Sequence, residues 1–127
     1  MTYRIKFEGN VPASLNQVMR WNPHRKRRER LMWMKAIHAL LGGPTMVQLI
    51  TLARNETRMR VRVTICNPRR YDKDNAYGAC KIVFDAIRNL GLVYDDREEF
   101  MDQIVEQEKW PAKQKHTRIE IGPAEVA

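Results

Sequence analysis

The feature that most constrains this fold is a strand-like run that leads, through a short acidic turn, into an amphipathic helix. Residues 59–67 alternate apolar and polar side chains, which is the two-residue period of a strand with one buried face. Residues 76–90 instead place their apolar side chains at the i, i+3 and i+4 positions of a helix. The sequence therefore predicts a sheet against which a helix packs one apolar face.

Two aspartates stand at the start of the predicted helix. Asp72 and Asp74 are two residues apart, and an extended chain points such side chains to the same side. The helix beginning beside them presents unpaired backbone N–H groups and the positive end of its dipole. One interpretation is part of a site for a divalent cation. The alternative is a simple turn, with Asp74 or Asn75 as the helix cap.

A second acidic pair, Asp95 and Asp96, follows the helix beyond Gly91. The two pairs can meet only if the chain folds back along the helix, and the apolar residues 92–94 are predicted to be that returning strand. Four carboxylates brought together in a strongly basic protein favour a site for a hard divalent cation.

The charge balance indicates the class of partner. The chain has 127 residues, a formal net charge of +8 and a pI near 9.9, so a polyanion such as nucleic acid is expected. Residues 24–30 form a basic block at the start of a predicted helix, for which phosphate contact is favoured over a role in solubility. Arg60 and Arg62 give the predicted strand a basic face, which would extend the positive surface if exposed. Charge alone does not separate a nuclease from a passive binder.

The remaining pattern predicts one small α+β domain, residues 1–127, with a mixed sheet packed against two main helices. Residues 46–53 and 59–66 are predicted to form a hairpin, and a helix is predicted over residues 23–41. Further strands are predicted at residues 3–8, 100–109 and 117–121.

Several classes of protein are disfavoured. No apolar run reaches the length of a membrane-spanning helix, and the N-terminus lacks the apolar stretch of a signal peptide, so a cytoplasmic protein without a membrane partner is expected. Cys66 and Cys80 have no metal-ligand spacing and are predicted to be small buried side chains.

An ordered set of motifs in the middle third of the chain resembles the RusA family of Holliday junction resolvases. The motifs are Asp72-Lys73-Asp74-Asn75, Lys81, Phe84-Asp85-Ala86-Ile87 and Gly91-Leu92-Val93-Tyr94-Asp95-Asp96. The first third, with Pro12-Ala13-Ser14-Leu15-Asn16, is similar to small phage-type members more loosely, and the last quarter matches only in general character.

The resemblance implies a compact homodimer that binds four-way DNA junctions and cuts them with Mg²⁺, for which Mn²⁺ is a possible substitute. The family's essential acids map onto Asp72, Asp74 and Asp96, with Asp95 as an alternative to Asp96, and its functional lysine maps onto Lys81. Five residues separate Asn75 from Lys81, more than in the best-known family pattern. The difference of three is close to one helical turn, so the lysine would still face the site.

These residue types suit phosphodiester hydrolysis, because Mg²⁺ takes oxygen ligands and activates water. Basic side chains near the acids and on the basic helix would guide the DNA strand by charge. The predicted DNA-binding residues are Arg25, Lys26, Arg27, Arg28, Arg69, Arg70, Lys73 and Arg97. Two alternatives stay open: a non-catalytic DNA-binding protein in which the acids only cap and turn the chain, and a nuclease acting on flaps or other branched DNA.

Overall fold

Four strands and four α-helices form a mixed α+β fold in the computed structural model, which describes residues 1–124. The elements are β1 (Tyr3–Glu8), α1 (Leu15–Val18), α2 (Pro23–Leu41), α3 (Gly43–Arg54), β2 (Met59–Asn67), α4 (Lys73–Asn89), β3 (Met101–Lys109), a short 3₁₀ turn (Ala112–Gln114) and β4 (His116–Pro123). The predicted fold class is confirmed, and so are the strand at residues 59–67 and the helix at residues 23–41.

The sheet has the strand order β1-β4-β2-β3, so β1 and β3 are its two edges. β4 runs antiparallel to both β1 and β2, whereas β2 and β3 are parallel. Parallel neighbours need a crossover connection, and α4 provides it between β2 and β3.

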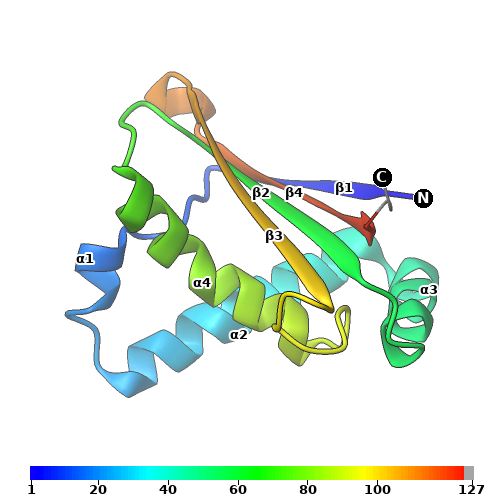
Figure 1. Ribbon diagram of the computed structural model, residues 1–127. Helices are drawn as coiled ribbons and strands as arrows, with labels where there is room; N and C mark the ends of the chain where they lie inside the picture. The colour runs from blue at the N-terminus through cyan, green and yellow to red at the C-terminus, as the bar shows by residue number, and fades with distance from the viewer. Residues whose placement is uncertain (125–127) are drawn as a thin grey trace.

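Figure 1 shows α2 and α4 crossing the same face of the sheet, while the described chain places no helix on the other face. The alternation predicted for β2 explains this layering: Val61, Val63 and Ile65 are buried against the helices, and their neighbours point the other way. Phe7 of β1 packs edge-on against Trp33 of α2, with ring centroids 5.1 Å apart. The apolar core therefore lies between the helices and one side of a single sheet.

The predicted hairpin of residues 46–53 and 59–66 is wrong, because the first of these segments is helix α3. Gly42, with φ of 80°, turns the chain after α2, and Pro44 falls in the first turn of α3, where its missing N–H costs nothing. Met46, Leu49 and Ala53 are the buried residues, which is a helical spacing. β2 pairs instead with β3 and β4.

The predicted returning strand at residues 92–94 is also absent; this segment is a loop that buries Leu92 and Val93 in the core. The strand that returns along α4 is β3, which begins only at Met101. The acidic pair Asp95 and Asp96 precedes that return and stays at the C-terminal end of α4.

Cys66 and Cys80 are free and buried, as predicted. No single helix of the described chain has both the length and the apolar character needed to cross a membrane; α2 and α3 reach them only if taken together, and they meet at a bend of 110°.

Candidate functional site

The N-terminus of α4 holds Asp72 and Asp74. Asp72 is the N-cap: its Oδ1 accepts a hydrogen bond from the backbone N–H of Asn75 at 2.9 Å, and its Oδ2 accepts one from the Asn75 side-chain amide at 3.0 Å. The cap is therefore neither Asp74 nor Asn75, the two residues that the sequence suggested. Asp74, in the first turn, is exposed and forms no ion pair within the described chain. Its carboxylate is free to bind a ligand.

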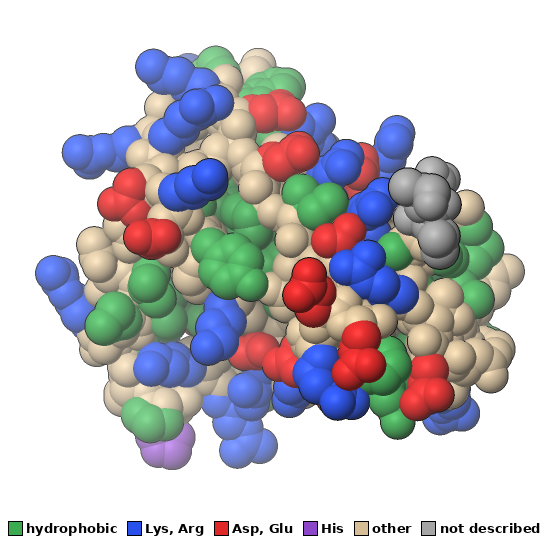
Figure 2. All heavy atoms as spheres, viewed as in Figure 1, with side chains coloured by type: hydrophobic (Ala, Val, Ile, Leu, Met, Phe, Trp, Pro, Cys, Tyr) green, Lys and Arg blue, Asp and Glu red, His purple; other side chains and the backbone are tan. Residues whose placement is uncertain are grey.

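Basic side chains surround these two acids. Arg69 and Arg70 lie exposed in the loop between β2 and α4, and Lys73 is the first residue of α4. The loop is tied to the C-terminal end of β3, because the Tyr71 N–H donates to Gln107 Oε1 at 2.8 Å. Figure 2 shows Lys and Arg side chains gathered at this end of the molecule.

The last residue of β3 and the connection from β3 to β4 add three exposed lysines at this end. They are Lys109, Lys113 and Lys115. The Trp110 N–H donates to the carbonyl of Asn67 at 3.2 Å, which holds the connection against the end of β2. Only the parallel pairing of β2 with β3 brings these lysines close to the loop before α4, so a linear pattern could not have assigned them to the site.

The first turns of α2 carry the basic block. Arg25, Lys26, Arg27 and Arg28 are all exposed there. Asn22 caps the helix by accepting from the Arg25 N–H at 2.8 Å, and the Arg25 guanidinium lies 4.3 Å from the centroid of the Trp21 ring. This end of α2 is a second positive surface, separate from the loop before α4.

The carboxylates of the second acidic pair, Asp95 and Asp96, already form ion pairs with arginines. Asp95 Oδ2 accepts from Arg97 Nε at 3.0 Å, and Asp96 Oδ2 lies 3.1 Å from Arg88 Nη1. Hydrogen bonding to the side chain and backbone of Asp96, and then the Arg97 guanidinium, hold the pKa of Asp95 below its ordinary value. Arg97, predicted to guide DNA beside Asp72, lies instead at this opposite end of α4.

One chain does not bring the two acidic pairs together. α4 has 17 residues, and at about 1.5 Å per residue it separates its ends by about 25 Å. Oxygens that share one magnesium ion lie within about 4 Å of one another, because each bond is about 2.1 Å long. Within residues 1–124, no group of three or more His, Cys, Asp or Glu side chains is placed to hold a metal ion. The predicted convergence of Asp72 and Asp74 with Asp95 and Asp96 inside one chain is therefore wrong.

Lys81 lies seven residues after Asp74 and projects from the same side of α4. It is exposed and lines a groove formed with α1 and α2. Its separation from Asp74 along the helix is about 10 Å, too far for direct contact of the two side-chain termini at one small ion.

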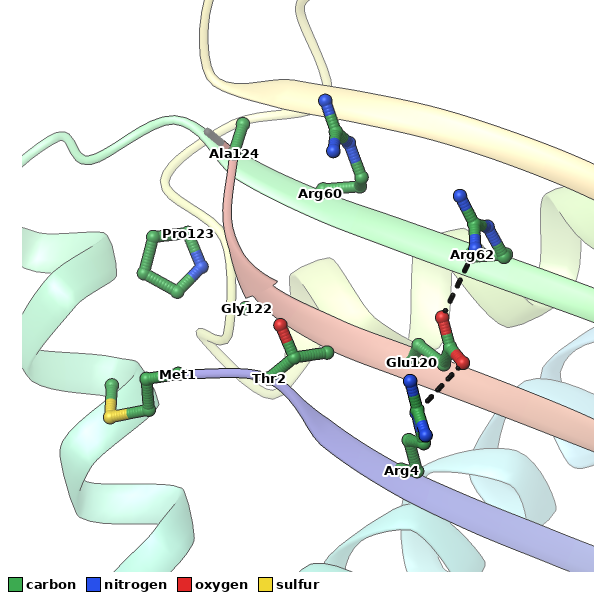
Figure 3. Close-up of a pocket in the computed structure, with 9 residues that line it drawn as sticks. All are labelled: Met1, Thr2, Arg4, Arg60, Arg62, Glu120, Gly122, Pro123 and Ala124. Atoms are coloured by element: carbon green, nitrogen blue, oxygen red, sulfur yellow. Dashed lines mark hydrogen bonds and ion pairs between the residues drawn. The ribbon is translucent and has the colours of Figure 1, made fainter. Parts of the chain in front are cut away.

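The uncovered face of the sheet is charge-compensated and does not extend the basic surface. A cavity of about 420 Å³ lies on this face. Figure 3 shows Glu120 lying in it between Arg4 and Arg62. Glu120 is 2.9 Å from Arg4 Nε and 3.4 Å from Arg62 Nη1. Arg60 is paired with Asp102 on β3 at 2.8 Å. The positive surface therefore lies at the ends of α2 and α4.

Comparison of the chain with models of known protein families and with curated proteins gives no match. What the fold and the site define is a small α+β chain with an exposed acidic cap at one end of a crossover helix, set among basic side chains.

Proposed function

We propose that this protein is a Mg²⁺-dependent endonuclease that cuts branched DNA, in particular four-way junctions, in the cytoplasm. The observation that carries the proposal is the exposed Asp74 carboxylate, without an ion-pair partner in the described chain, amid basic residues. Basic side chains alone would suffice to bind DNA. A carboxylate kept among them repels phosphate unless a cation lies between the two. Asp72 and Asp74 are the hard oxygen donors that such a cation prefers.

Two carboxylates at one end of α4 leave the site short of its predicted third acid, and a second copy of the chain is the source we propose. In a two-fold dimer whose α4 helices run antiparallel, the N-terminus of one α4 lies beside the C-terminus of the other. Asp72 and Asp74 of one protomer would then face Asp95 and Asp96 of its partner. Asp96 is the third ligand that the family resemblance implies.

The free edge of β3 supports this arrangement. β3 has one sheet neighbour, β2, within the described chain, so its outer edge presents unpaired backbone groups. Pairing β3 antiparallel with the β3 of a second copy would continue the sheet and place the two α4 helices side by side, running in opposite directions. Tyr77 of α4, 52% exposed, donates to Gln103 of β3 at 2.5 Å and borders this edge.

The chemistry required of the residues follows from this placement. A magnesium ion held by the aspartates would neutralise phosphate charge and make a bound water nucleophilic. Lys81 and the arginines of the preceding loop would hold the strand by its flanking phosphates. A dimer with one site from each pair of helix ends would deliver two incisions related by symmetry, which is what a four-way junction requires.

A non-catalytic DNA-binding protein is the second candidate, and a specific observation favours it. Each acid except Asp74 has a partner within its own chain: Asp72 caps α4, Asp95 pairs with Arg97, and Asp96 pairs with Arg88. Under this reading the aspartates stabilise the two ends of one helix, and only the basic residues contact DNA.

Cleavage of a synthetic four-way junction separates the two candidates. The nuclease nicks opposing strands with Mg²⁺ or Mn²⁺, and Asp74→Asn abolishes the nicks while binding persists. Glu56→Gln, an exposed acid in the turn before β2, is the matched control and retains activity. Tight binding with no cleavage in either metal would falsify the nuclease proposal. A flap and a replication fork in the same assay test whether another branch is the preferred substrate.

Mixing two inactive variants tests the shared site. If the aspartates come from two protomers, a heterodimer of Asp74→Asn with Asp96→Asn retains one intact site and regains single nicks. If each site lies within one protomer, every site in the heterodimer keeps one substitution and the mixture stays inactive. Millimolar Mg²⁺ should likewise raise the melting temperature of the wild type and not that of Asp74→Asn.

A further inference from the structure

A groove between α1, α2 and α4 combines an apolar wall with a cationic rim. Its volume is about 290 Å³, and Leu15, Met19 and Ile82 supply apolar surface. The charged residues that line it are Lys26, Arg30, Lys81 and Asp85, so its side chains carry a net positive charge. This combination differs from the mainly polar loop that precedes α4.

Close packing of α1 against α4 shapes the groove. Gly78 permits it, because a Cβ at this position would lie 2.7 Å from the Leu15 Cβ. α1 is held in shape by a capping box, in which the Gln17 N–H donates to Ser14 Oγ at 3.3 Å and the Ser14 N–H donates to Gln17 Oε1 at 3.1 Å. The apolar wall is therefore a built part of the fold.

Arg30 lines the groove and also carries a buried donor without an acceptor in the described chain. Its Nε is buried and has no hydrogen-bond acceptor among the residues that the structure describes. A buried donor without an acceptor is unfavourable, and a guanidinium is most strongly satisfied by an anionic oxygen. Lys26, one turn earlier on α2, and Lys81, across the groove on α4, add positive charge at the same place.

We propose that this groove binds one unpaired nucleotide of the DNA substrate. Its phosphate would contact Arg30, Lys26 and Lys81, and its sugar and base would lie against Leu15, Met19 and Ile82. A groove of this volume does not admit a duplex, whereas single strands are bound in grooves that combine positive charge with apolar contact. Asp85 offers an acceptor for a base N–H.

The position of the groove favours DNA over an acidic peptide as its occupant. Gly78 and Lys81 lie on the side of α4 that also carries Asp74, about 6 Å and about 10 Å from it along the helix. A strand held at Asp74 would thus continue into the groove. The inference rests on the proposed function, because a branch point is what supplies unpaired nucleotides next to a duplex.

The test compares Arg30→Gln with Lys35→Gln, which removes the same charge from an exposed position of the same helix. Arg30→Gln should weaken binding of a short oligothymidylate about tenfold, the usual effect of losing one charge-assisted hydrogen bond, and Lys35→Gln about twofold at most. Binding of a duplex of the same length should change equally in both variants. Lys26→Gln, an exposed site where folding is not at risk, should repeat the selective loss.

Methyl NMR locates the binding directly. Oligothymidylate should shift the methyl signals of Leu15, Val18 and Ile82 in the wild type, and a polyglutamate peptide should not. Equal losses in Arg30→Gln and Lys35→Gln, unshifted groove methyls, or a response to polyglutamate alone would each overturn the groove proposal. Failure of the proposed function is a separate result: the wild type would then leave the junction uncut in Mg²⁺, whatever the oligothymidylate does.

Discussion

Removing the cap of α4 is a sensitive perturbation, because Asp72 has both a local structural contact and a proposed role in metal binding. Its Oδ1 satisfies the Asn75 backbone N–H at 2.9 Å. Losing an N-cap side chain costs about 1 kcal/mol, and losing a negative charge from the first turn of a helix costs roughly 0.5 kcal/mol. Asp72→Ala should therefore lower the free energy of unfolding by about 1.5 kcal/mol.

Two matched variants divide that loss into its parts. Asp72→Asn keeps a capping oxygen and removes the charge, and Asp74→Ala removes a first-turn charge that caps nothing, so each should cost only about 0.5 kcal/mol. In a chain of this size 1 kcal/mol corresponds to roughly 3–5 °C in melting temperature. Urea unfolding at low salt without divalent metal measures all three variants. Equal losses for Asp72→Ala and Asp74→Ala would refute the capping argument.

Three further predictions concern other parts of the fold. Gly122→Ala should lower the free energy of unfolding by about 2 kcal/mol, because the new Cβ would overlap the Met1 carbonyl oxygen. Gly43→Ala, whose new Cβ meets nothing within 4 Å, should leave the free energy of unfolding unchanged, and urea unfolding compares the two variants. Burial raises the pKa of the Cys66 thiol and raises that of Cys80 to about 12. A thiol reagent at pH 8 should therefore label neither cysteine until urea unfolds the chain, and rapid labelling of the native protein would contradict this prediction. Hydrogen bonds from Trp110 and Arg118 lower the pKa of Glu108 below its ordinary value of 4.5, so its contribution to stability is present above pH 4.5 and is lost as the pH falls through the lower folded value. Glu108→Gln should therefore flatten the acid limb of a stability–pH curve relative to Glu56→Gln, and an unchanged limb would count against this pairing.

Local patterns were sufficient to predict those elements whose period was unambiguous. Residues 59–67 alternate apolar and polar side chains. Residues 23–41 begin with Pro23 directly after Asn22 and are followed by Gly42, which are start and stop signals for a helix. Residues 46–53 are a short apolar run that suits a strand or a buried helix, and periodicity over so few residues does not choose between them. The spacing of Met46, Leu49 and Ala53 was the available signal for the helix.

The sequence predicted which acidic residues flank α4, but not how they lie relative to one another. Asp72, Asp74, Asp95 and Asp96 do mark the two ends of α4, as the motif spacing indicated. Whether the chain returns before or after Asp95 depends on which residues enter the core. Leu92 and Val93 enter it from a loop, and Met101 pairs with Met59 to start the returning strand. Such pairing between distant segments leaves no mark in the spacing of nearby residues.

The length of α4 fixes the distance between the groups at its two ends. One inserted residue would lengthen the helix by about 1.5 Å and rotate everything beyond it by about 100°. Changes of three, four or seven residues nearly preserve the angular phase, and the longer gap before Lys81 is of this kind. In a symmetric pair of chains the length of α4 would also set the distance between the two incisions, so the geometry of the substrate would constrain the length of this helix.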